Sequence, residues 1–218
     1  MKKFAALLLV LAMVLAFAGC AMTHDKYMEA AMDSKVTVDT YVQATQSWWD
    51  NKITVYSQDM EGGYFMYEMA CSEEDAAKLV PGTKIRVKGE KIEYAGEVEI
   101  GSGTFEILEG SYIAEPVDLT AYLGTEELAS YMNVKAAFKG LTVEKVEHKY
   151  GEPGDDIYLT LEKDGVEYSF CVEIYLTGAD HAVYTTVAEL AEGDVVDVEG
   201  FLYWYEGMNP HITSITKI

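Results

Sequence analysis

The segment LVPGTKIRVKG at residues 79–89 occurs a second time, in altered form, as LAEGDVVDVEG at residues 190–200. The match extends beyond these segments, because Tyr94 and Gly96 align with Tyr205 and Gly207 at the same offset. The identities fall on turn glycines and on apolar positions that alternate as in a β-strand. Self-similarity of this kind indicates a duplicated domain, so we expect two copies of one fold.

Each copy shows the same order of predicted elements: three strands, a short helix and two further strands. In the first copy we expect strands at 35–46, 52–58, 64–70, 83–94 and 104–108, and a helix at 72–79 opened by a capping box at Ser72. In the second copy we expect strands at 134–146, 157–163, 167–175, 194–205 and 212–218, and a helix from about 180 to 190. This is the element order of an OB-fold. The predicted fold class is therefore mainly β: two tandem OB-fold-like, five-stranded Greek-key barrels, each with a helix between strands 3 and 4.

The strand motifs GTKIRVKG (82–89) and GDVVDVEG (193–200) resemble those of uncharacterised bacterial surface lipoproteins with tandem OB-fold-like domains. The resemblance covers most of the chain after residue 19. It implies barrel strands and a cell-surface location, but no catalytic residue.

The first twenty residues are typical of an export signal. Lys2 and Lys3 precede an apolar run at 4–18, which ends in FAGC at 17–20 and is too short for a comfortable membrane span. The ending resembles a lipobox, which implies cleavage before Cys20, fatty-acid attachment to its sulfur, and a protein anchored on the extracytoplasmic face of the cell membrane. The alternative is an ordinary secretory signal that contains a cysteine, which would release the protein.

The predicted organisation follows from these features. It comprises a signal peptide (1–19), a lipidated N-terminus with a short helix (20–34), a first OB-like domain (35–110), a linker with short helices (111–132) and a second OB-like domain (133–218). The helical pattern at 23–32 either covers a barrel end or leads away from the membrane. Cys71 and Cys171 fall in different copies, which favours two buried, unpaired thiols over a disulfide bridge.

Composition excludes several classes of function. The chain is 50% hydrophobic and 12% aromatic, which excludes intrinsic disorder, and its net charge of −21 opposes nucleic-acid binding. Its four histidines lie in separate segments without the spacing of a metal site. The acidic residues Glu152, Asp155 and Asp156 lack a twelve-residue calcium loop. We therefore expect a non-enzymatic protein with no metal and no cofactor.

Aromatic residues concentrate where an OB-fold usually binds its ligand, on strands 2 and 3 and on the loops between strands 1 and 2 and between strands 4 and 5. Strand alternation assigns Ile53, Val55, Phe65, Tyr67 and Met69 to the first core, which leaves Tyr56, Tyr64 and Met66 outside. The candidate ligand-binding residues are Trp48, Trp49, Tyr56, Tyr64, Tyr94, Tyr203, Trp204 and Tyr205.

Aromatic rings beside carboxylates suit sugars and peptides better than nucleic acids. We therefore expect a lipid-anchored binding or adaptor protein whose partner is a glycan, a peptide or an envelope protein. The same rings also fit plugs for the barrel ends or a domain interface, which would favour a structural subunit of an envelope or transport complex. An exported hydrolase would require two acids with raised pKa values in one cleft.

Overall fold

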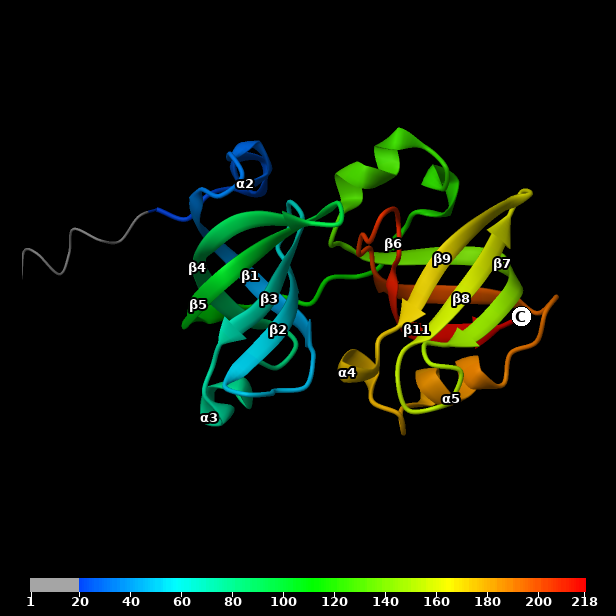
Figure 1. Cartoon of the computed structure of the whole chain (residues 1–218). Coiled ribbons are helices and arrows are strands. Elements are labelled where there is room, and N and C mark those ends of the chain that lie inside the picture. Colours follow the sequence, from blue (N-terminus) through cyan, green and yellow to red (C-terminus); the bar gives the residue numbers. More distant parts are fainter. Residues whose placement is uncertain (1–19) are drawn as a thin grey trace, which may run out of the picture.

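Strands dominate the chain and form two barrels that lie side by side, joined by a linker that runs along one side (Figure 1). The computed structural model describes residues 20–218, so the predicted signal peptide lies outside the described residues. Among residues 20–218, every helix is too short or too polar to cross a membrane.

Barrel 1 is closed, with the strand order β1-β2-β3-β5-β4. Its elements are β1 (Lys35–Thr45), β2 (Lys52–Gln58), β3 (Gly63–Ala70), α3 (Glu73–Ala76), β4 (Thr83–Tyr94) and β5 (Glu97–Ser111). The predicted capping box is confirmed, because Ser72 Oγ accepts a hydrogen bond from the backbone N–H of Asp75. The fifth strand is much longer than expected, since it begins directly after a tight turn at Ala95 and Gly96.

Barrel 2 repeats this order, because the pairing of β10 with β7 closes its sheet into a ring. Its elements are β7 (Lys135–His148), β8 (Ile157–Lys163), β9 (Val166–Val172), α4 (Ile174–Thr177), α5 (Ala182–Ala188), β10 (Val195–Phe201) and β11 (His211–Lys217). A short strand, β6 (Val117–Asp118), adds to the edge of β7. The expected OB-like strand order is thus present in both copies.

The single helix expected near residues 180–190 is wrong, because two helices occupy the connection. β9 ends at Val172 rather than at residue 175, since the carboxylate of Glu173 accepts a hydrogen bond from the backbone N–H of Leu176 and caps α4. Tyr175 therefore lies on a helix instead of a strand.

The glycine at the end of each repeated segment marks a close approach of two strands. A Cβ atom on Gly89 would overlap Ile100, and one on Gly200 would overlap the backbone of His211. Both positions adjoin a register shift between the fourth and fifth strands of their barrel. Glycine is retained in both copies because a side chain would force these strands apart.

The expected side-chain register of β3 is wrong for most of the strand. Tyr64 and Met66 are fully buried in the core of barrel 1, whereas they were expected on its outer face. Phe65 and Tyr67 were expected in the core and instead face outward, Phe65 toward barrel 2 and Tyr67 toward solvent.

A β-bulge accounts for this difference. Ile53 pairs with Met69 and Val55 pairs with Met66, so β3 contains one more residue than β2 between the two pairs. Glu68 lies in this interval with a φ of 48°. An extra residue moves the following side chains to the other face of a strand, so alternation counted back from Met69 places Tyr64 and Met66 on the wrong side.

The N-terminal helix α2 (His24–Glu29) covers one end of barrel 1, which decides between the two roles expected for residues 23–32. Tyr27 is fully buried in the barrel core, and His24 Nε2 lies 3.2 Å from the carbonyl oxygen of Gly63. Cys20, which precedes this helix, is exposed. Cys71 and Cys171 are buried and free, so a bridge between them is excluded.

The linker packs against barrel 2. It contains two short 3-10 helices, η2 (Thr120–Tyr122) and η3 (Glu126–Tyr131), and it buries Leu119 and Leu128 in the core of that barrel. Thr125 precedes η3 as expected, but its hydroxyl donates to the carbonyl oxygen of Tyr122 and does not cap the helix.

Candidate binding site

Barrel 2 covers the middle of the surface on which an OB-fold usually binds its ligand. Tyr56 on β2 is 1% exposed and Phe65 on β3 is 2% exposed, and both pack against Phe201 of barrel 2. The Tyr56 and Phe201 rings are stacked with their centroids 4.7 Å apart. This part of the expected ligand surface is therefore an interface between the barrels, which we call the junction.

The remaining part of that surface stays open beside the loop between β1 and β2. A cavity of about 370 Å³ lies there, and three aromatic side chains line it: Trp49, Tyr67 and Tyr175. These three residues are 78%, 48% and 60% exposed, respectively. The other lining residues are Gln46, Ser47, Lys52, Ile53, Thr54 and Glu68. We call this cavity the aromatic groove.

Local backbone geometry turns Trp49 outward. Trp49 and Lys52 exchange two backbone hydrogen bonds across a two-residue turn, in which Asp50 and Asn51 have φ values of 47° and 59°. Asp and Asn tolerate this left-handed conformation better than most residues. The turn therefore presents the indole ring at the edge of the barrel instead of folding it into the core.

The other two rings reach the groove by features that strand alternation does not reveal. The bulge at Glu68 places Tyr67 on the outer face of β3. Helix α4 of barrel 2 carries Tyr175, whose carbonyl oxygen accepts a hydrogen bond of 2.7 Å from the backbone N–H of Ser47 in barrel 1. The groove is therefore built by both barrels.

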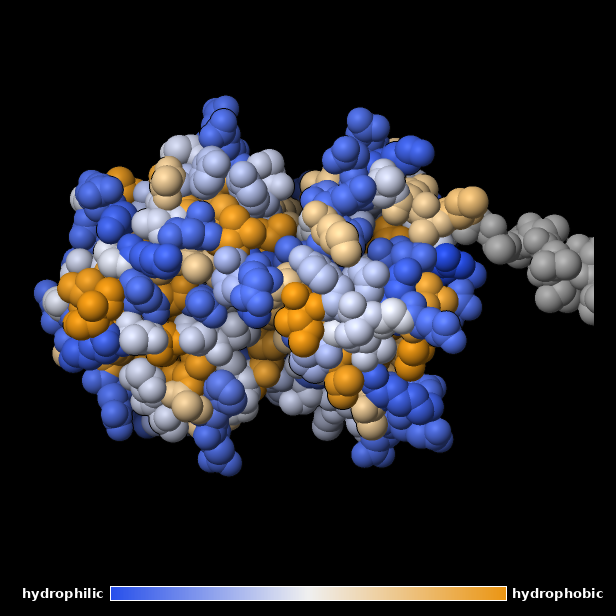
Figure 2. Space-filling model, turned by 180° about the vertical axis from the view of Figure 1, so that it is seen from behind, coloured by the Kyte–Doolittle hydropathy of each residue, from blue (hydrophilic) through white to orange (hydrophobic). Residues whose placement is uncertain are grey.

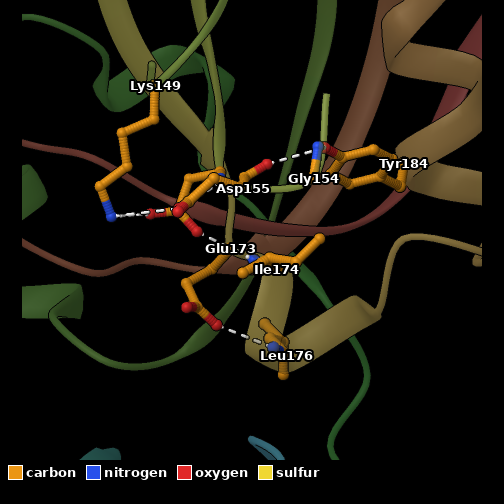
Figure 3. A network of polar contacts seen from close by, with 8 residues as sticks. Lys149, Gly154, Asp155, Glu173, Ile174, Leu176 and Tyr184 are labelled. Carbon is orange, nitrogen blue, oxygen red and sulfur yellow. Dashed lines mark hydrogen bonds and ion pairs between the residues drawn. The ribbon is translucent and has the colours of Figure 1, made fainter. Parts of the chain in front are cut away.

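The polar network in Figure 3 holds α4 in place. Asp156 accepts hydrogen bonds from Lys149 Nζ at 2.8 Å and from the backbone N–H of Ile174 at 3.0 Å, so it ties the loop between β7 and β8 to the start of α4. The hydroxyl of Tyr184 fixes the same loop by donating to the carbonyl oxygen of Asp155. Burial raises the pKa of Glu173, the cap of α4, to about 7. These contacts set the position of Tyr175.

Charge within the aromatic groove is balanced. Lys52 Nζ lies 2.8 Å from Glu68 Oε2, and this contact raises the pKa of the lysine above its usual value. A second cavity of about 410 Å³ shares Ser47 and Tyr175 with the aromatic groove and also borders Trp48 and Glu73. The wall of the groove thus combines aromatic faces with amide, hydroxyl and paired ionic groups.

The predicted binding residues on the first barrel lie in different environments. Trp49 lies at the groove, whereas Trp48 is half-buried, lines the second cavity and donates its indole N–H to the carbonyl oxygen of Cys71 at 2.8 Å. Tyr56 is enclosed in the junction, and Tyr64 lies in the barrel core near His24.

The predicted residues on the two loops between fourth and fifth strands meet one another. The rings of Tyr94 and Tyr205, which occupy equivalent positions in the repeat, lie 6.2 Å apart and remain exposed. Tyr203 stacks on His211 with centroids 4.3 Å apart, and Trp204 packs on the core of barrel 2. These loops therefore take part in the contact between the barrels.

Two acids with raised pKa values occur together, which is one of the two conditions for a carboxylate-pair hydrolase. Burial raises the pKa of Glu97 to about 8 and that of Glu99 to about 7. Both are buried beneath barrel 2, and neither lines the aromatic groove or the second cavity. Within residues 20–218 no cluster of three or more His, Cys, Asp or Glu residues is arranged to hold a metal ion.

No protein-family model and no curated protein matches the chain. Similar solved structures include a murine DNA-binding protein bound to double-stranded DNA, with 11% identity, coverage of 84% of this chain and 95% of that chain, and a TM-score of 0.39. They also include the tetrameric p202 HIN2, with 11% identity, coverage of 86% and 96%, and a TM-score of 0.37. A replication protein A heterotrimer bound to single-stranded DNA shows 14% identity, coverage of 88% and 50%, and a TM-score of 0.36.

Proposed function

We propose that the protein is a lipid-anchored extracytoplasmic binding protein that holds a neutral glycan in the aromatic groove. The observation that carries this proposal is the set of three solvent-exposed rings, Trp49, Tyr67 and Tyr175, around one cavity. Exposed rings offer flat apolar faces on which the apolar face of a sugar ring stacks. Gln46, Ser47 and Thr54 supply amide and hydroxyl groups at the same wall for sugar hydroxyls.

The charge distribution favours a neutral ligand. The one lysine and the one glutamate of the groove are paired with each other, and the whole chain carries a net charge of −21. A field of this sign repels polyanions at long range, and the groove offers no basic track for phosphate groups.

The position of the anchor supports a ligand site that faces away from the membrane. Cys20 precedes α2, which contacts Gly63 at the hairpin end of β2 and β3. The groove adjoins Lys52 at the opposite end of these strands, so barrel 1 separates it from the anchor. Metabolic labelling with an alkyne fatty acid tests the anchor: we expect labelling of the natural chain and none of Cys20→Ser.

Binding to an array of immobilised neutral oligosaccharides tests the function itself. We expect signals that disappear in Trp49→Ala and in Tyr175→Ala. Tyr150→Ala is the matched control, because Tyr150 is an equally exposed ring on the corresponding loop of barrel 2 and does not line the groove. Equal binding by the natural chain and all three variants would contradict the proposal.

A structural subunit of an envelope or transport complex is the second candidate, and the exposed pair Tyr94 and Tyr205 favours it. Elsewhere, on the face in Figure 2, hydrophobic residues form small groups separated by hydrophilic ones, which is typical of a solvated surface. Co-purification from membranes decides this case: a partner lost from the double variant Tyr94→Ala, Tyr205→Ala but retained by Trp49→Ala would favour the structural role.

A further inference from the structure

Glu97 lies at the contact between the two barrels, apart from the aromatic groove. It is the first residue of β5 in barrel 1, and its side chain is 0% exposed. Its Oε2 atom accepts a hydrogen bond of 2.8 Å from the backbone N–H of Trp204 in barrel 2. The carboxyl group therefore takes part directly in holding the barrels together.

The other oxygen of this carboxyl group lacks a hydrogen-bond donor. Within residues 20–218, Glu97 Oε1 and Asn133 Oδ1 are both buried without a partner. The side chain of Asn133 lies beside the carboxyl group, and its Nδ2 atom donates to the carbonyl oxygen of Val98 at 3.2 Å. Two buried acceptors without a donor are costly, and protonation removes the charge of the carboxyl group and turns it from an acceptor alone into a group that also donates.

The groups around Glu97 do not neutralise a negative charge. Glu99 lies two residues along the same strand, and Tyr27 of α2 and Tyr203 of barrel 2 both approach the two carboxyl groups. Lys91 on the neighbouring strand β4 donates its ammonium group to the carbonyl oxygens of Met28 and Ala30. In the described part of the chain, neither carboxyl group forms an ion pair.

We propose that Glu97 is protonated when the barrels are seated on each other, and that its ionisation loosens barrel 2 from the outer face of β2 and β3. Release would expose Tyr56 and Phe65, which barrel 2 covers at the junction in the seated state. Burial raises the pKa of Glu97 to about 8, in agreement with a protonated group at neutral pH. The junction is thus a proton-linked contact within the fold.

Proton binding by Glu97 determines in which direction pH changes the population of the released state. The carboxyl group binds its proton more tightly in the seated state than in the released state, where solvent lowers its pKa to the ordinary range. The population of the released state therefore rises with pH up to the seated pKa of about 8 and then levels off. Glu99 and Glu173 have pKa values of about 7, so their contributions level off earlier and leave the interval from about 7 to about 8 to Glu97.

Hydrogen exchange measured by mass spectrometry on the purified, membrane-extracted protein tests this proposal. After correction for the intrinsic pH dependence of exchange, we expect segments 53–67 and 201–208 to exchange roughly fivefold faster at the upper end of that interval than at the lower end, because the effect levels off at the seated pKa of about 8. Segment 157–163, the inner strand β8 of barrel 2, serves as the internal reference and should stay constant.

The variant Glu97→Gln is the sharpest comparison, because its amide copies the protonated carboxyl group. It keeps an acceptor for the Trp204 N–H, carries no charge and places an N–H donor where the unpaired oxygen Oε1 stands. We expect exchange of the junction segments in Glu97→Gln to be independent of pH in this interval, and Glu99→Gln to retain the increase. Equal pH dependence in the natural chain and Glu97→Gln would overturn the proposal. If Glu97→Gln does not fold, the natural chain alone still tests the proposal: exchange of its junction segments that does not increase with pH in this interval would overturn it.

Discussion

The phenolic oxygen of Tyr56 in barrel 1 lies 2.6 Å from Nδ1 of His211 in barrel 2. Gln46 Nε2 donates a hydrogen bond to the same phenolic oxygen, so the Tyr56 hydroxyl is left to donate to the imidazole. Burial lowers the pKa of His211 to about 3, which keeps the ring neutral and Nδ1 able to accept. One hydrogen bond thus links the outer face of β2 to the start of β11.

The substitution Tyr56→Phe tests the contribution of this link to stability. It leaves Nδ1 of a buried histidine without a donor, and we expect it to lower the free energy of unfolding by about 1 to 3 kcal/mol. Urea unfolding at neutral pH measures the change, and Tyr150→Phe, which alters an exposed ring, is the control. A loss no greater than that of the control would show that the hydrogen bond adds nothing to stability.

Trp48 and Trp49 are neighbours with opposite expected roles. Trp48 is half-buried and donates its indole N–H to Cys71, so Trp48→Ala should lower the free energy of unfolding by roughly 1 to 3 kcal/mol. Trp49 is exposed, so Trp49→Ala should change it by less than about 0.5 kcal/mol. Thermal or urea unfolding of the two variants checks the difference. A reversed order would mean that Trp49 belongs to the core.

The pH dependence of stability should carry the signature of Glu97. Its pKa is raised on folding, so the favourable contribution is fully present below the unfolded pKa and is lost as pH rises toward about 8. At alkaline pH we expect Glu97→Gln to exceed the natural chain in stability by about 5 kcal/mol, because the pKa of Glu97 rises from 4.5 to about 8 on folding, and we expect the two proteins to match only below the unfolded pKa. Unfolding free energies over this pH range measure the effect. If the unfolding free energies of the natural chain and of Glu97→Gln change with pH in parallel, Glu97 does not carry this pH dependence.

Gly89 and Gly200 should be equally intolerant of a side chain. A methyl group at either position collides with the adjacent fifth strand, so Gly89→Ala and Gly200→Ala should each lower the free energy of unfolding by about 2 kcal/mol or more. Urea unfolding of the two single variants provides the measurement. Stability like that of the natural chain in either variant would show that the repeated glycine is not required by packing.

The repeat predicted the strand order well because its identities, such as Gly89 with Gly200, occupy places where geometry restricts the residue type. Side-chain direction in β3 was not predictable from alternation, since the bulge at Glu68 reverses it. Tyr175 was missed because a short helix interrupts the expected strand. The junction could not be predicted from local sequence patterns either, because its contacts, such as that of Tyr56 with His211, join residues 155 positions apart.

The central claim is that the open aromatic groove, and not the covered part of the barrel surface, holds the ligand. Nuclear magnetic resonance of the three tryptophan indole N–H groups during titration with neutral oligosaccharides tests it most directly. We predict that the Trp49 signal shifts, while the signals of Trp204 and of Trp48, whose N–H is held by Cys71, change little. A shift centred on Trp204, or no shift of Trp49 with any neutral oligosaccharide, would contradict the account.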